Sequence, residues 1–142
     1  MQSSVEKKQI YADDFLRGLL AALVVNNHGK IRAEEPEIHR AFHRVMLELK
    51  KPDVLAKMDV VDLADVDYDP LYAQSRWFDR ELTRAQRNLV LSFPNPTYAT
   101  IAIKYGEDEA NRILDSFSGA RDTVIGLAEF FHKQLTEPQQ VA

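Results

Sequence analysis

Apolar side chains recur every three or four positions over most of this sequence, and this spacing constrains the fold more than any other feature. Such spacing places the apolar residues on one face of an α-helix. Five stretches carry the pattern, at 11–24, 38–49, 78–89, 110–117 and 124–135. The chain is therefore predicted to be mostly helical.

Asparagine, glycine and proline mark the ends of these stretches. Asn26, Asn27 and Gly29 are expected to end the first helix, because both residue types tolerate the left-handed conformation of a helix C-terminus. The second helix is expected to begin near Pro36, since proline suits the first helical position, and to stop before Pro52.

Two runs rich in β-branched and aromatic residues, 89–93 and 97–103, follow the third helical stretch and are separated by Pro-Asn-Pro at 94–96. This arrangement predicts a β-hairpin with a short loop. In the alternative, Asn95 caps a helix that ends at Gly106. The hairpin is preferred because the prolines forbid a continuous helix and the Thr and Ile content favours strands.

Length and composition indicate one globular domain. The chain has 142 residues, 45% of them apolar, which fits a single domain and is too apolar for a disordered chain. We expect a flexible N-terminus over 1–9, a globular domain over 10–136 and a flexible tail over 137–142. The longest apolar run, Leu19–Val25, is too short for a membrane helix. The N-terminus lacks the apolar core of a signal peptide, and the absence of cysteine fits a reducing compartment. A cytoplasmic protein without a membrane partner is therefore expected.

The formal charge of −4 is distributed unevenly along the chain. Residues 53–69 hold six aspartates against Lys57, a net charge of −5, which leaves +1 for the remainder. The acidic stretch, residues 53–70, is expected to be a connection inside the domain with one short helix. The mildly acidic total argues against nonspecific nucleic-acid binding but allows a basic face on one element.

Arginines line one side of the helix predicted over 75–89. The four are Arg76, Arg80, Arg84 and Arg87. At about 100° per residue they fall opposite the apolar stripe, with no acidic residue inside their arc. Arginine makes bidentate contacts with phosphate and guanine. The four are therefore the candidate binding residues for DNA or an acidic protein, while a solvated helix face and pairing with the acidic stretch remain alternatives.

The order of elements, three helices and then a hairpin, resembles that of winged-helix domains over residues 10–104. The resemblance implies that the helix before the hairpin lies in the DNA major groove and that 94–96 forms the tip of the wing. The sequence departs from that pattern in its long acidic connection and in a wing tip without Arg or Lys. The expected fold class is mostly α with a small β-hairpin (α+β), a winged-helix-like helical domain with two C-terminal helices.

Two other patterns compete with this interpretation. A capping box at 83–86 would restart the third helix at Thr83. A helix-turn-helix over 97–114 is disfavoured, because Glu107, Asp108 and Glu109 would face phosphate from the start of its second helix.

Histidines at helical spacing are the weak metal candidates. His39 and His43 lie four residues apart, with Glu35 one turn earlier, so the three could share a helix face. The segment lacks the glutamate between the histidines of an HExxH motif, so two partly exposed surface histidines are preferred. No phosphate loop or nucleophile motif is present.

The expected function is a non-enzymatic regulatory or adaptor module without a cofactor, binding DNA or an acidic protein through the arginines. The further alternative is a metal-dependent enzyme that uses His39 and His43. Phe130 beside Phe131 gives the last helix a wide apolar face, which predicts a homodimer.

Overall fold

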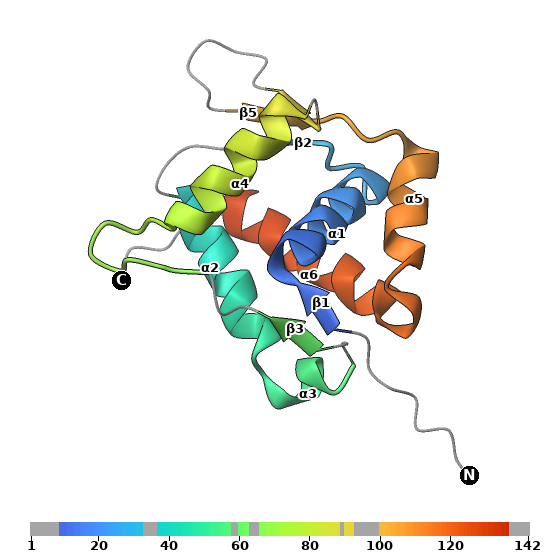
Figure 1. The fold of residues 1–142 in the computed structure, drawn as a ribbon, viewed down its shortest axis with the longest axis horizontal. Helices are drawn as coiled ribbons and strands as arrows, with labels where there is room; N and C mark the ends of the chain where they lie inside the picture. Colours follow the sequence, from blue (N-terminus) through green and yellow to red (C-terminus); the bar gives the residue numbers. More distant parts are fainter. Residues whose placement is uncertain are drawn as a thin grey trace.

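The structure, a computed structural model, describes residues 9–32, 37–57, 60–62, 66–88, 90–92 and 100–136 (Figure 1). In chain order the elements are β1 (Gln9–Tyr11), α1 (Ala12–Val25), β2 (Lys30–Arg32), α2 (Glu37–Leu49), α3 (Pro52–Leu55), β3 (Val60–Asp62), α4 (Arg76–Arg87), β4 (Leu91–Ser92), β5 (Thr100–Ile103), α5 (Glu107–Asp115), the 3-10 turn η1 (Ser118–Ala120) and α6 (Arg121–Thr136). The predicted class, mostly helical with a small hairpin and two C-terminal helices, is confirmed.

Three helices, α1, α2 and α6, build the centre of the molecule. α1 packs against α5 and α6, and α6 also packs against α2 (Figure 1). The largest buried side chains of these helices include Phe15, Leu19, Phe42 and Phe131. One cluster of buried residues extends from Ile10 to Leu135. In the part of the chain that the structure describes, no helix is long and apolar enough to cross a lipid bilayer.

A glycine permits the close approach of α1 to the end of α5. A Cβ atom built on Gly18 would stand 2.4 Å from two ring carbons of Phe117, well inside van der Waals contact. Phe117 is only 4% exposed, so its ring occupies the space that a side chain at position 18 would need.

The three-stranded antiparallel sheet has the order β2-β5-β4. Ile31 pairs with Ile101, and Ser92 pairs with Ala102. The predicted hairpin is therefore confirmed, and the helical alternative is wrong, because 100–103 is a strand whose residues Ile101, Ala102 and Ile103 are buried. The same strand contradicts a helix-turn-helix over 97–114. The predicted wing tip at 94–96 lies outside the described residues.

Three strands have no counterpart in the sequence prediction. β2 forms the second edge of this sheet, and β1 pairs with β3 in parallel, with Ile10 opposite Val61. Each of them is three residues long. That is too short for an alternating pattern to stand out from the surrounding sequence.

α4 is one continuous helix, so the alternative in which it restarts at Thr83 is wrong. Ser75 caps its N-terminus, where the hydroxyl oxygen accepts a hydrogen bond from the Phe78 N–H at 3.1 Å. The Thr83 hydroxyl instead donates to the Asp79 carbonyl, 3.0 Å away and one turn earlier.

The one short helix expected in the acidic stretch is α3, which begins one residue earlier, at Pro52, and has this proline in its first turn. Farther along, the Asp69 backbone pairs with Gln74 in an isolated bridge, and the turn between them exposes Leu71 and Tyr72. Residues 58–59 and 63–65 of the stretch, residues 1–8 and the tail over 137–142 lie outside the described residues.

The apolar face of α6 is covered within the chain. Phe131 is 2% exposed, and the partly buried Phe130 packs against the same core. The width of this face was the basis for predicting a homodimer, and contacts inside one chain account for it. Self-association stays a prediction.

Candidate functional site

The arginine face of α4, defined as Arg76, Arg80, Arg84 and Arg87, is exposed at all four positions. At about 1.5 Å of rise per residue it extends roughly 16 Å along the helix. The opposite side of α4 carries Trp77, Phe78 and Leu82 into the core. Phe78 stacks on Phe42 of α2 with ring centroids 4.2 Å apart, which anchors the helix with its arginines outward.

One of the four arginines is paired. Arg84 Nη1 lies 3.2 Å from Oε2 of Glu81, whose side chain is 9% exposed. Over the described residues, the guanidinium groups of Arg76, Arg80 and Arg87 make no ion pair or hydrogen bond. Within the described residues, the face therefore presents three arginines without an ion pair and one that is partly neutralised.

Two aspartates of the acidic stretch, Asp67 and Asp69, direct their carboxylates to backbone N–H groups. Asp67 accepts hydrogen bonds from the Ser75 hydroxyl at 3.3 Å, the Arg76 N–H at 3.1 Å and the Trp77 N–H at 2.9 Å. Asp69 accepts from the Leu71 N–H at 2.9 Å within its own turn. Neither carboxylate pairs with a guanidinium group of the arginine face.

The carboxyl group of Asp67 serves the N-terminus of α4. Partial burial raises its pKa, but the hydrogen bonds from Trp77, Arg76 and Ser75 outweigh this effect and hold the pKa below its ordinary value. Ionised Asp67 thus satisfies N–H groups that have no partner inside the helix.

A hollow of about 500 Å³ separates the arginine face from the start of α1. Arg80 and Arg84 line it together with Trp77, and Asp13 and Asp14 line it from α1. Carboxylates thus flank the face on this side. An anionic ligand is therefore expected to approach the arginine face from the side away from α1.

The two predicted metal candidates on α2, His39 and His43, lie in different environments. His39 is 1% exposed, so the expectation that it lies at the surface is wrong. Its Nδ1 accepts a hydrogen bond from the Ser75 N–H at 3.0 Å, which ties α2 to the start of α4. His43 is partly exposed and stacks on Tyr68, with ring centroids 3.8 Å apart.

This geometry gives His39 and His43 structural roles. Burial lowers the pKa of His43, and the charges of Lys50 and Arg44 lower it further. Among the described residues the two rings do not join a three-ligand group. Glu35 lies outside the described residues.

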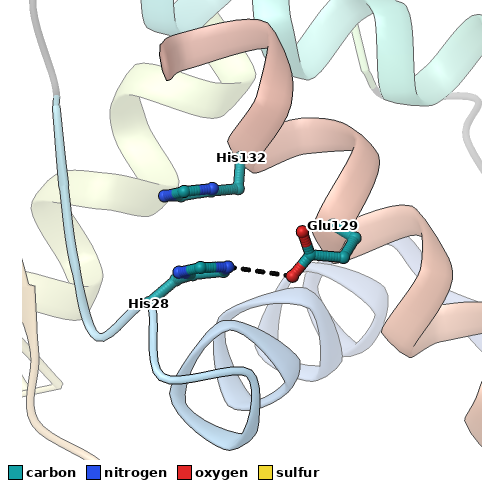
Figure 2. Close-up of side chains that lie close together, drawn as sticks. All are labelled: His28, Glu129 and His132. Atoms are coloured by element: carbon teal, nitrogen blue, oxygen red, sulfur yellow. Dashed lines mark hydrogen bonds and ion pairs between the residues drawn. The ribbon is translucent and has the colours of Figure 1, made fainter. Parts of the chain in front are cut away.

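A different set of metal-ligating residues does come together, and the sequence analysis missed it. His28 and His132 stack face to face, with ring centroids 3.5 Å apart and planes inclined by 4° (Figure 2). His28 Nε2 lies 2.9 Å from Oε1 of Glu129. One ligand atom from each of the three lies within 4.8 Å of the others.

The local signal for this cluster is weak. Glu129 and His132 are three residues apart on α6, a spacing that places two side chains on one face. His28 is 101 residues away from Glu129 and belongs to the turn after α1. Burial lowers the pKa of His132, the charge of His28 lowers it further, and Glu129 opposes both effects.

Comparison with family models, with curated protein sequences and with solved structures finds no match for this chain. The resemblance to winged-helix domains stays a prediction from the order of this chain's elements.

Proposed function

We propose that this protein is a non-enzymatic DNA-binding module in which the arginine face of α4 enters the major groove. The observation that carries the proposal is the exposed row of arginines, three of them unpaired within the described residues. The major groove is wide enough to admit an α-helix, and arginine is the side chain best suited to phosphate and guanine.

The arrangement of elements supports this orientation. α1, α2 and α4 precede the β4–β5 hairpin, and β2, from between the first two helices, completes the sheet. α4 packs against β4 and lies at the outside of the molecule, with its C-terminal end near the sheet (Figure 1). A winged-helix-like domain would use this helix for recognition, with the hairpin beside it on the DNA.

Charge on the helix also supports contact with phosphates. Each phosphate neutralised by the protein contributes about 0.9 to the slope of log affinity against log salt. Three contacts then lower the affinity about 40-fold between 50 and 200 mM salt, and four lower it about 150-fold. The acidic total charge limits nonspecific attraction, so most of the binding must come from this face.

The test is a fluorescence anisotropy titration of a labelled duplex of mixed sequence, with the full chain, at several salt concentrations. The informative variant is Arg80→Ala/Arg87→Ala, because neither side chain has an ion-pair partner among the described residues whose charge would be left unpaired. We expect the variant to bind more weakly and to lose about 2 from the salt slope.

The matched control is Arg112→Ala/Lys133→Ala, which removes two exposed cationic side chains from α5 and α6 that also have no ion pair among the described residues, and which changes the net charge equally. This control should keep the slope of the unaltered protein. Absence of DNA binding at low salt, or an equal loss of DNA affinity and salt slope in both variants, would refute the DNA proposal. If the protein binds polyglutamate but not DNA, and Arg80→Ala/Arg87→Ala loses that binding, the partner of the arginine face is an acidic protein and not DNA.

A further inference from the structure

We infer that His28, Glu129 and His132 bind one divalent transition-metal cation, with zinc as the best match. Two imidazole nitrogens and one carboxylate oxygen are a donor set that zinc and related metals take in proteins. Three protein ligands leave one coordination position for water or another small ligand. This site is separate from the arginine face and does not depend on it.

The fold holds the three residues ready for a common ligand. The turn that carries His28 closes with a hydrogen bond from the His28 N–H to the Leu23 carbonyl at 2.7 Å. Asn27 takes a positive φ of 65°, and the Asn26 side-chain amide donates to the Ile125 carbonyl of α6 at 3.4 Å. The turn is therefore fixed against the helix that supplies the other two ligands.

The distances leave a short path to coordination. Ligand atoms on a tetrahedral zinc ion with bonds of about 2.1 Å are roughly 3.4 Å apart. The atoms here already lie within 4.8 Å of one another. His28 and Glu129 have side chains that are 25% and 43% exposed, so side-chain rotation can close the difference without moving the helices.

The nitrogen atoms of the two imidazole rings are available to bind a metal ion. Neither ring nitrogen of His132 hydrogen-bonds to any described residue, and neither is sealed from solvent. A carboxylate only accepts, so His28 Nε2 carries the proton in its hydrogen bond with Glu129. Metal binding moves that proton from Nε2 to Nδ1 or to solvent, and the metal takes its place between the imidazole and the carboxylate.

Coordination must also open the imidazole stack. The two rings are nearly parallel, and their in-plane lone pairs cannot point at one ion from that arrangement. One ring therefore has to turn about its Cβ–Cγ bond when the metal binds (Figure 2). This rotation gives the site a spectroscopic signature: the ring resonances of His28 and His132 should both shift on binding.

The experiment uses the untagged full chain, stripped with a chelator and titrated with Co²⁺ and Zn²⁺. We expect one metal per chain, a visible absorption band typical of low-coordinate Co²⁺, and displacement of Co²⁺ by Zn²⁺. His28→Gln, Glu129→Gln and His132→Gln should each weaken binding at least tenfold. His43→Gln is the matched control, because His43 is also a stacked, partly buried histidine and lies outside the cluster.

NMR of the unaltered protein tests the site without any substitution. Histidine ring signals of His28 and His132 should shift on zinc addition, while those of His39 and His43 should stay in place. Absence of binding at micromolar metal, equal weakening by His43→Gln, or shifts confined to His39 and His43 would overturn the inference.

Discussion

Replacement of Gly18 by alanine tests how closely α1 packs against the end of α5. The new Cβ atom would stand 2.4 Å from two ring carbons of Phe117, about 1 Å inside the closest ordinary contact. Phe117 is 4% exposed, and it borders a hollow of about 560 Å³ beside α1 and α5. Either the ring or the helix must shift, and both are parts of the main core.

Two opposing effects set the size of the change. Alanine favours a helix interior over glycine by about 1 kcal/mol. Overpacking a filled core costs about 1–3 kcal/mol, and the middle of that range applies because the end of the Phe117 ring can shift toward the hollow that it borders. We therefore expect Gly18→Ala to lower the free energy of unfolding by about 1 kcal/mol.

Gly126→Ala is the matched control, because Gly126 lies inside α6 and a Cβ atom there meets nothing within 4 Å. It should raise the free energy of unfolding by about 1 kcal/mol, so the two alanines act in opposite directions. Urea unfolding followed by circular dichroism measures both. Adding Phe117→Leu to Gly18→Ala should recover stability beyond the sum of the single changes. A Gly18→Ala protein as stable as Gly126→Ala, or strict additivity in the double variant, would refute the packing argument.

Other predictions concern single contacts. Asp67→Asn should lower the free energy of unfolding by about 1 kcal/mol at neutral pH, measured by urea unfolding. Partial burial raises the pKa of Asp67, but its hydrogen bonds lower the pKa by more, so the carboxylate is more acidic in the folded protein. The stability difference between the two proteins should therefore vanish as pH falls below about 4. Because burial, Lys50 and Arg44 lower the pKa of His43, stability should drop as pH falls below about 6.5, and His43→Gln should make that drop smaller. Zinc at 100 times its Kd should raise the free energy of unfolding by about 2.7 kcal/mol, and His132→Gln at the same zinc concentration should reduce this gain to about 1.4 kcal/mol or less.

Local patterns predicted the helices because helical periodicity is read over neighbouring residues. The stripe expected on the second helix is buried at every position, from Ile38 through Phe42 to Leu49. Tyr11 is the exception, since it precedes α1 as its N-cap residue and is 56% exposed. The hairpin was also predictable, because proline placement and β-branched content act over a few residues.

Side-chain partners were beyond local pattern even where the helix was predicted correctly. The arginine face and the i,i+3 spacing of Glu81 and Arg84 follow from the sequence, but only the packed helix showed that the Glu81 side chain is 9% exposed. His39 and His43 share a helix at the predicted spacing, yet one enters the core and the other stacks on Tyr68. Neighbouring elements decided the difference, since Ser75 supplies the N–H that holds His39.

The sequence by itself determined the helical class, the hairpin and the outward row of arginines, because each depends on residues that are close together in the chain. The tertiary structure alone decided that Asp67 binds the backbone N–H groups of Arg76 and Trp77, so that this carboxylate leaves the guanidinium groups of the arginine face open. It alone also joined His28 to Glu129 and His132 across 101 residues. Contacts of that separation depend on how α1 and α6 pack, and no short pattern in the sequence encodes that geometry.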